Sequence, residues 1–294
     1  MDLTNLSTNV VIRNNMIEDV GGDAIVLIGT KGGLVEGNRV YGARRRFNTA
    51  DHDTIMHAGA SVGIWPWSSK DSVIRFNEVW GYKGTFDGQG LDSDYNCTNT
   101  HFEYNFSGDN EGGFFLICSD FEHEKRGNSI GNTNSTLHYN ISFNDHTRTF
   151  LINGPLRNIE VKGNIIYNVV DENLVGVVDA TPNAAVNKNV IFSQNRFYTK
   201  APFKAYRGYW KANGCGTFAQ KAPMNYKQIQ FSNNQFSKVF RHKEPGMKML
   251  KGEHTLFSLI DTFKEADPEV YRNYIKLMEF MKKSRHWERV KAGR

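Results

Sequence analysis

The sequence has few cysteines and no long apolar run, and each absence excludes a class of protein. Three cysteines in 294 residues are too few for the disulfide framework of a small secreted domain, and they lack zinc-site spacing. A membrane-spanning helix needs about 18 consecutive apolar residues, and no such stretch is present. The opening residues, MDLTNLS, also lack the pattern of a signal segment. Either the protein is cytoplasmic or a leader has been removed; the compartment stays open, and we favour a secreted or periplasmic location.

The composition is that of a folded protein whose charge is unevenly placed. Hydrophobic residues make up 39% and aromatic residues 13% of the chain, which argues against disorder. The length allows one elongated domain or two compact ones. Much of the net charge of +5 comes from lysines and arginines after residue 240. Because such a tail is usually a solvated helix face, we expect no nucleic-acid partner.

An internal repeat is the most informative pattern. Each unit is a run of β-favouring residues, then an asparagine, then an apolar residue within two positions, as in 11–17 (VIRNNMI) and 73–79 (VIRFNEV). The intervals between these asparagines have a floor of 23–24 residues and reach 39, which indicates one coil of fixed size with loop insertions. The repeated asparagines are Asn15, Asn38, Asn77, Asn105, Asn140, Asn164, Asn195 and Asn234.

Short strands, turn residues and this period are typical of a parallel β-solenoid. In such a stack we expect the asparagines to form a ladder, with each side-chain amide bonding the coils above and below. Over residues 7–240 the pattern resembles the right-handed parallel β-helix superfamily of pectate-lyase-like proteins. The resemblance implies an all-β fold similar to the carbohydrate-active members of that superfamily.

The repeat ends near residue 245, and a helical pattern follows. Asp267 and Pro268 predict an N-cap and first turn, and apolar residues follow at helical spacing as far as Met281. We therefore expect a β-helix domain over 1–245 and a C-terminal helical segment over 246–294. Its apolar stripes are predicted to cover the open C-terminal end of the solenoid.

The other end of the solenoid has no recognisable cap, because the repeat is already running by residue 9. End coils normally need a cap. We expect either a missing N-terminal region or an oligomer partner to provide it, and we expect no membrane partner.

One segment, 86–96 (FDGQGLDSDYN), places carboxylates where neighbouring repeats have glycine or apolar residues. Asp92 and Asp94 are two residues apart, so on a strand they face one side, with Cα atoms about 6.6 Å apart. Asp87 precedes them, in a position where an aspartate is as readily a turn residue. Two acidic side chains that face the same side of a strand favour a functional site over an apolar core.

Aligning the coils through their apolar runs places other residues around these acids. Trp65 and Trp67 fall one coil below Asp92 and Asp94, and Glu111 matches Asp87 at a strand start. Indoles stack on sugar faces, and carboxylates bond hydroxyls and move protons. The tryptophans equally fit packing under a loop. We expect catalytic residues among Asp92, Asp94, Asp87 and Glu111, and substrate-binding residues among Trp65, Trp67, His57, His52, Arg46 and Asp120, the last four from two loop insertions.

Three functions fit this pattern. The first is a glycoside hydrolase that acts on a polysaccharide or oligosaccharide through one member of Asp92 and Asp94 paired with Asp87 or Glu111, and it needs no cofactor. The second is a polysaccharide lyase, the best-known activity of similar folds, in which the acids would bind Ca²⁺. The strands near the acids carry no lysine or arginine, which disfavours a lyase. The third is a non-catalytic, tailspike-like solenoid that binds glycans.

Overall fold

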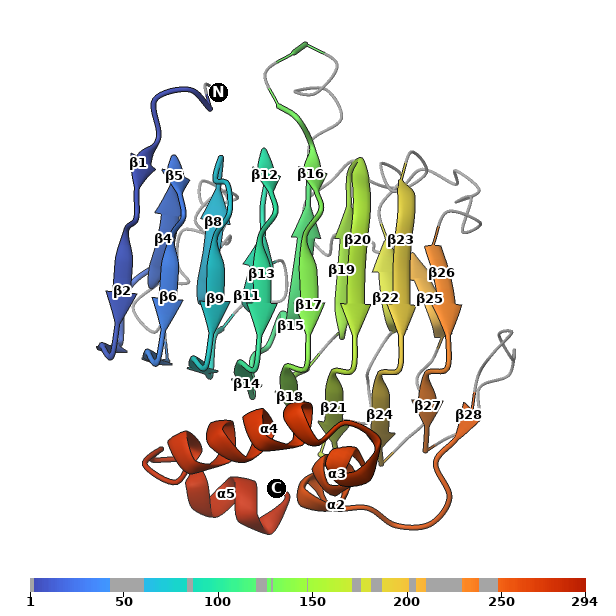
Figure 1. Cartoon of the computed structure of the whole chain (residues 1–294). Helices are drawn as coiled ribbons and strands as arrows, with labels where there is room; N and C mark the ends of the chain where they lie inside the picture. Colours follow the sequence, from blue (N-terminus) through green and yellow to red (C-terminus); the bar gives the residue numbers. More distant parts are fainter. Residues whose placement is uncertain are drawn as a thin grey trace, which may run out of the picture.

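The protein is a stack of parallel strands with a group of helices along one side (Figure 1). The computed structural model describes residues 3–42, 61–83, 87–119, 126–127, 129–146, 148–170, 176–180, 187–200, 205–209, 229–237 and 248–294. Each coil contributes one strand to each of three sheets, and the strand pairs that the structure describes are all parallel. The expected all-β class and right-handed parallel β-helix are confirmed.

The three sheets are named here by the order in which the chain enters them. The first sheet contains β2 (Val11–Arg13), β6 (Leu34–Glu36), β9 (Val73–Arg75), β13 (His101–Glu103), β17 (Thr136–His138), β20 (Leu156–Lys162), β23 (Lys188–Ser193) and β26 (Ile229–Ser232), with β12 (Cys97–Thr98) and β16 (Asn132–Thr133) at its edge. The second contains β3 (Met16–Glu18), β7 (Arg39–Tyr41), β10 (Glu78–Trp80), β14 (Phe106–Gly108), β18 (Ile141–Phe143), β21 (Ile165–Asn168), β24 (Arg196–Thr199), β27 (Gln235–Phe236) and β28 (Lys248–Met249). The third contains β4 (Ile25–Ile28), β8 (Ile64–Trp67), β11 (Gln89–Ser93), β15 (Gly113–Cys118), β19 (Phe150–Asn153), β22 (Gly176–Ala180) and β25 (Ala205–Tyr209). A separate pair joins β1 (Ser7–Thr8) to β5 (Thr30–Lys31).

The predicted asparagine ladder runs through all eight positions at the corner between the first and second sheets. At its centre, Asn77 Nδ2 donates to Asn105 Oδ1 over 2.9 Å, and Asn105 Nδ2 donates to Asn140 Oδ1 over 2.9 Å. The residue before each asparagine takes the left-handed backbone conformation, as Tyr104 does with φ 53°. The ladder thus satisfies buried amides at the corner where each coil turns.

Apolar side chains fill the inside of the stack. In the third sheet, Ile25, Ile64, Leu91, Phe115 and Phe150 occupy successive coils of this core and are at most 3% exposed. Period-two alternation then turns the intervening residues of the same strands outward. The candidate site lies on that outward face.

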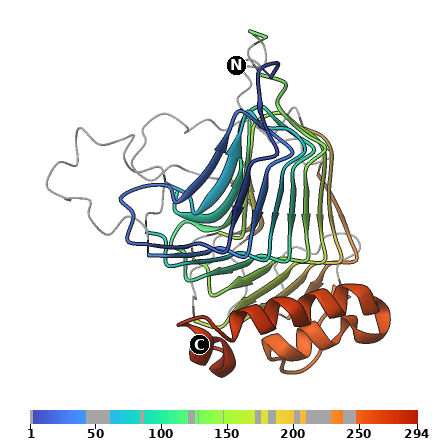
Figure 2. The same ribbon diagram turned by 60° about the vertical axis from the view of Figure 1, so that its left-hand side comes forward.

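The C-terminal helices are α2 (Leu256–Asp261), α3 (Phe263–Ala266), α4 (Pro268–Met281) and α5 (Trp287–Ala292). They lie along the outer side of the second sheet, and not over the end of the solenoid as the sequence had suggested (Figures 1 and 2). The reason is that this sheet turns a column of aromatic side chains outward, including Trp80 and Phe143, and these pack with Tyr274 and Leu277 of α4. None of the helices that the structure describes is long and apolar enough to cross a membrane.

Candidate active site on the third sheet

The register of the third sheet confirms the coil alignment made from the sequence. Leu91 pairs with Ile64, which sets Asp92 beside Trp65 on the neighbouring coil. On the other side, Asp92 pairs with Leu116. The backbone N–H of Asp94 donates to the carbonyl of Pro66 over 3.2 Å, which continues the pairing just past β11. The two aspartates and two tryptophans therefore lie on adjacent coils.

In the strands of the third sheet, the residues that face outward do not extend back to the start of each strand. Phe114 is fully buried in the core, and a Cβ on Gly90 would lie 2.4 Å from the Ser107 hydroxyl inside the solenoid. The chain turns into the third sheet at this point. Gly90 and Phe114 therefore still point inward, although they lie two positions before Asp92 and Leu116. The usable outer face begins at Asp92.

Asp92 and Asp94 differ in how much solvent they meet. Asp92 is 3% exposed, and burial, followed by the charges of Asp94, Asp87 and Asp23, raises the pKa of its carboxyl well above the usual value. Asp94 is partly exposed and follows the strand. Burial raises the pKa of its carboxyl to about 7, aided by the charges of Asp87 and Asp23 and opposed by hydrogen bonds from Tyr95 and Cys118. A carboxyl group with a pKa near neutrality can donate a proton at neutral pH.

Asp87 is held by close backbone packing and by a side-chain amide. A Cβ on Gly112 would lie 1.6 Å from the carbonyl oxygen of Asp87, so only glycine permits this approach of neighbouring coils. The Gln89 amide nitrogen donates to Asp87 Oδ1 over 3.0 Å, while its oxygen accepts from Arg148 Nη2 over 2.9 Å. The opposite amide orientation would set oxygen against carboxylate and nitrogen against guanidinium. Asp87 is thereby tied to the strand that carries Asp92.

Glu111 has a different setting from Asp87. Its carboxylate lies 3.0 Å from the Lys83 ammonium, and its side chain is 39% exposed. It is not among the charges that shift the pKa of Asp92 or Asp94, whereas Asp87 is. The two residues match in the coil register, as predicted, but it is Asp87 whose charge acts on the other acids.

The two tryptophans form a partly exposed pair next to the acids. The ring centroids of Trp65 and Trp67 are 6.3 Å apart with an interplanar angle of 31°. Two enclosed polar atoms, Asp92 Oδ1 and Trp65 Nε1, have no hydrogen-bond partner among the described residues. Buried polar atoms are normally satisfied, so these two atoms on adjacent coils depart from the usual pattern.

Sequence reasoning missed three residues of this site: Asp23, Gln89 and Arg148. Asp23 heads the strand that served for the coil alignment, and its Oδ1 accepts from the Val62 N–H over 2.7 Å. The position of Asp23 at the start of that strand is the feature of the sequence that could have identified it. The other predicted residues, His57, His52, Arg46 and Asp120, lie outside the described residues.

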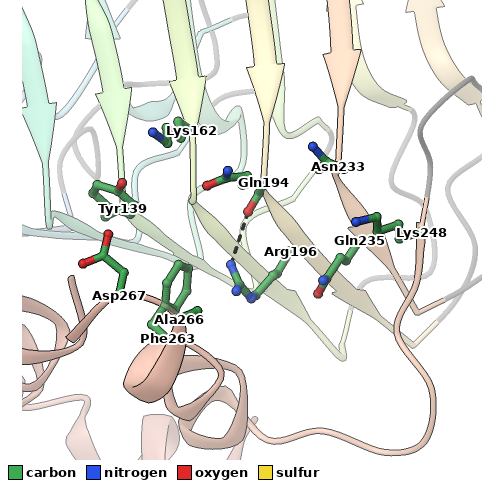
Figure 3. Close-up of a pocket in the computed structure, with 10 residues that line it drawn as sticks. All are labelled: Tyr139, Lys162, Gln194, Arg196, Asn233, Gln235, Lys248, Phe263, Ala266 and Asp267. Atoms are coloured by element: carbon green, nitrogen blue, oxygen red, sulfur yellow. Dashed lines mark hydrogen bonds between the residues drawn. The ribbon is translucent and has the colours of Figure 1, made fainter. Parts of the chain in front are cut away.

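A separate hollow of about 510 Å³ lies between the helices and the corner of the first two sheets (Figure 3). Its charged lining is mainly basic, with Lys162, Arg196 and Lys248. Its one lining carboxylate, Asp267, accepts from the Val270 N–H as the N-cap of α4. This pocket lacks the two carboxylates that acid–base cleavage of a glycoside needs, so the acidic cluster on the third sheet remains the candidate active site. Within the described part of the chain, no group of three or more His, Cys, Asp or Glu side chains is arranged to hold a metal ion.

Comparison with known proteins places this site in context. No family model matches the chain. The chain is 33% identical over 231 residues to lacto-N-biosidase from Bifidobacterium longum subsp. longum, a match that covers 75% of this chain and 13% of that protein. The chain therefore spans only a small part of the length of this curated relative.

Solved structures show a likeness of fold. The tailspike protein of E. coli bacteriophage HK620, solved in complex with a pentasaccharide, overlaps with a TM-score of 0.53 at 14% identity, covering 86% of this chain and 42% of that one. A GH136 lacto-N-biosidase from Eubacterium ramulus overlaps with a TM-score of 0.44 at 20% identity, covering 77% of this chain and 28% of that one. The tailspike likeness, at this low identity, supports the β-helix fold alone.

Proposed function

We propose that this chain carries the catalytic β-helix of a glycoside hydrolase that cleaves an oligosaccharide with a pair of carboxylates. The observation that carries the proposal is a group of acids whose charges act on one another, Asp87, Asp92 and Asp94, beside two partly exposed indoles on the outer face of the third sheet. The similarity to a lacto-N-biosidase supports the same reaction class and makes a lacto-N-bioside the first substrate to test.

Asp94 is the proposed proton donor. It is partly exposed, and its pKa of about 7 keeps a large fraction protonated at neutral pH. It can therefore protonate the leaving glycosidic oxygen as the bond breaks. Asp92 is too enclosed for direct attack at a sugar carbon, and burial together with the nearby charges raises its pKa and so favours its protonated form. Its proposed role is to back Asp94 with a buried carboxyl whose neutral form is favoured.

Asp87 is the proposed partner carboxylate. Its charge acts on both Asp92 and Asp94, and it is fixed by Gln89 and by the packing of Gly112. In a retaining reaction it would attack the sugar carbon, and in an inverting reaction it would activate water. The anomeric form of the first product, followed by ¹H NMR, distinguishes these two outcomes.

Substrate would rest against Trp65 and Trp67. Indole faces stack on the apolar faces of sugar rings, and the register sets these residues one coil from the acids. The proposed sugar contacts would then lie on the same face as the proposed proton donor. The carbohydrate substrate is thus proposed to lie across β8 and β11.

The test is a glycan-library screen that includes p-nitrophenyl lacto-N-bioside, run on the wild-type chain and on Asp94→Asn and Asp87→Asn. We expect the wild type to release a reducing sugar whether or not a chelator is present. Each variant should lose at least 100-fold in kcat/KM. Products that absorb in the ultraviolet and vanish with a chelator would instead show a lyase. Glycan binding without turnover, unchanged in both variants, would show a non-catalytic binding solenoid.

A further inference from the structure

A buried arginine lies on the same register line as Gln89. Gln89 of β11 pairs with Gly113 of β15, and the pairing of Phe115 with Phe150 carries this line on to Arg148, just before β19. Arg148 is 1% exposed and is among the largest fully buried side chains of the described core. A guanidinium enclosed in this way is costly unless polar groups compensate for the lost water.

Gly113 is what lets Arg148 reach Gln89. A Cβ on Gly113 would lie 2.2 Å from the Arg148 carbonyl oxygen and 3.1 Å from its Cγ. The arginine therefore occupies the space that a side chain on the intervening coil would fill. Beyond it, Arg148 Nη2 donates to the Gln89 oxygen over 2.9 Å.

Gln89 transmits this contact to Asp87. It is fully buried, and its nitrogen donates to Asp87 Oδ1 over 3.0 Å. An amide whose oxygen accepts from a cation is polarised, so its N–H groups become better donors. A hydrogen bond from such a donor fixes the plane of the carboxylate and favours its ionised form.

We propose that Arg148 and Gln89 form a positioning relay that orients the Asp87 carboxylate and keeps it ionised for attack. This inference rests on the role of Asp87 in the proposed function. The amide between the two charges contacts both, so the charge of the arginine supports the carboxylate through Gln89. Gly113 is the third part of the relay, because its missing side chain leaves the space through which Arg148 reaches Gln89.

The charged groups around Asp87 come from every strand packed nearby. Asp92 and Asp94 belong to its own segment, Asp23 precedes β4, and Glu111 with Lys83 lies beside β15. Negative charge on Asp94 opposes ionisation of Asp87. Arg148 supplies the opposing positive charge through Gln89, which is why the relay matters in so acidic a site.

The test compares Gln89→Met, which keeps the length of the side chain and removes its donor, with Asn187→Leu. Asn187 is a buried amide of another corner, whose Oδ1 accepts from the Leu156 N–H over 2.9 Å. Both variants should be less stable than the wild type. Only Gln89→Met is expected to lower kcat/KM, by about 10- to 100-fold as for one lost hydrogen bond to a charged group, and to move the acid limb of its pH profile to higher pH.

A second pair of variants tests the arginine. Arg148→Lys should keep the acid limb close to that of the wild type, because the charge is retained, whereas Arg148→Met should move it in the same direction as Gln89→Met. A ¹³C NMR titration of the Asp87 carboxyl in the wild type and in Gln89→Met gives a readout that needs no turnover. An unchanged titration and an unchanged pH profile in Gln89→Met would overturn the relay. A shifted titration in a chain that cleaves no glycan would uphold the relay and refute the proposed function.

Discussion

Replacing Asp94 by asparagine should abolish activity and at the same time stabilise the protein at alkaline pH. The pKa of Asp94 rises from 3.8 to about 7 on folding, chiefly through burial. A carboxyl group with a raised folded-state pKa contributes stability that is complete below its unfolded value and is lost as the pH rises through the folded value. For Asp94 the loss falls between about pH 4 and pH 7.

The size of the effect follows from that gap. Each pH unit between the folded and unfolded pKa values corresponds to about 1.4 kcal/mol, and a rise from 3.8 to about 7 gives a ceiling of roughly 4 kcal/mol. Solvent reaches part of the side chain, which screens its charge, so we expect about 2–4 kcal/mol. The Asp94→Asn variant removes this cost because an amide stays neutral, and its oxygen can still accept from the Tyr95 N–H.

The assay is urea unfolding of the wild type and Asp94→Asn at pH 5 and pH 8, with turnover measured on the same preparations. The difference in unfolding free energy between the two proteins should favour the variant more at pH 8 than at pH 5. Asp261→Asn, at an exposed position at the end of α2, serves as the control for replacing an aspartate outside the site. An equal difference at both pH values would mean that Asp94 is ionised throughout, and the assignment of Asp94 as proton donor would then fail.

Three further predictions concern the parts that build the site. Gly112→Ala should lower kcat/KM by at least 10-fold, because its Cβ would displace the neighbouring coil, whereas Gly21→Ala, with no atom within 4 Å of the new Cβ, should leave the rate unchanged. Asn105→Ala should destabilise the fold by about 3–5 kcal/mol in chemical denaturation, because it leaves several buried ladder groups unbonded. Asn15→Ala, at the solvent-exposed end of the ladder, should cost less than half as much. Trp67→Ala should raise KM by several-fold with a smaller change in kcat, since stacking holds bound substrate and transition state alike; a fall in kcat alone would contradict this role.

Features that repeat along the chain were predictable from the sequence. The ladder asparagines recur beside β-favouring residues, and each repeat of the pattern supports the assignment of the others. The same alignment predicted that Asp92 lies next to Trp65, because a shared register fixes neighbours across coils. The repeat therefore made both the fold and the position of the acids on the outer face predictable.

Features that occur once were not predictable in this way. Arg148 meets Gln89 only because Gly113 between them has no side chain, and the insertion before Arg148 hides its register in the sequence. The partner of the C-terminal helices was missed for a different reason. An apolar stripe shows that a helix face is covered but not by which surface, and the outward aromatic residues of the second sheet offered a second apolar surface beside the end of the solenoid.

The position of those helices bears on how the chain acquires its structure. They contact coils that are far apart in the sequence: Arg285 forms an ion pair with Glu18 over 3.0 Å, and Tyr274 donates to the Gly163 carbonyl over 2.7 Å. An unassisted stack of coils can gain or lose order one repeat at a time, since each repeat contacts only its neighbours. Here, a helical segment that follows the coils in the chain ties early and late coils together. The column of aromatic residues on the second sheet stays uncovered until these helices dock on it, and the coils then become a single cooperative unit.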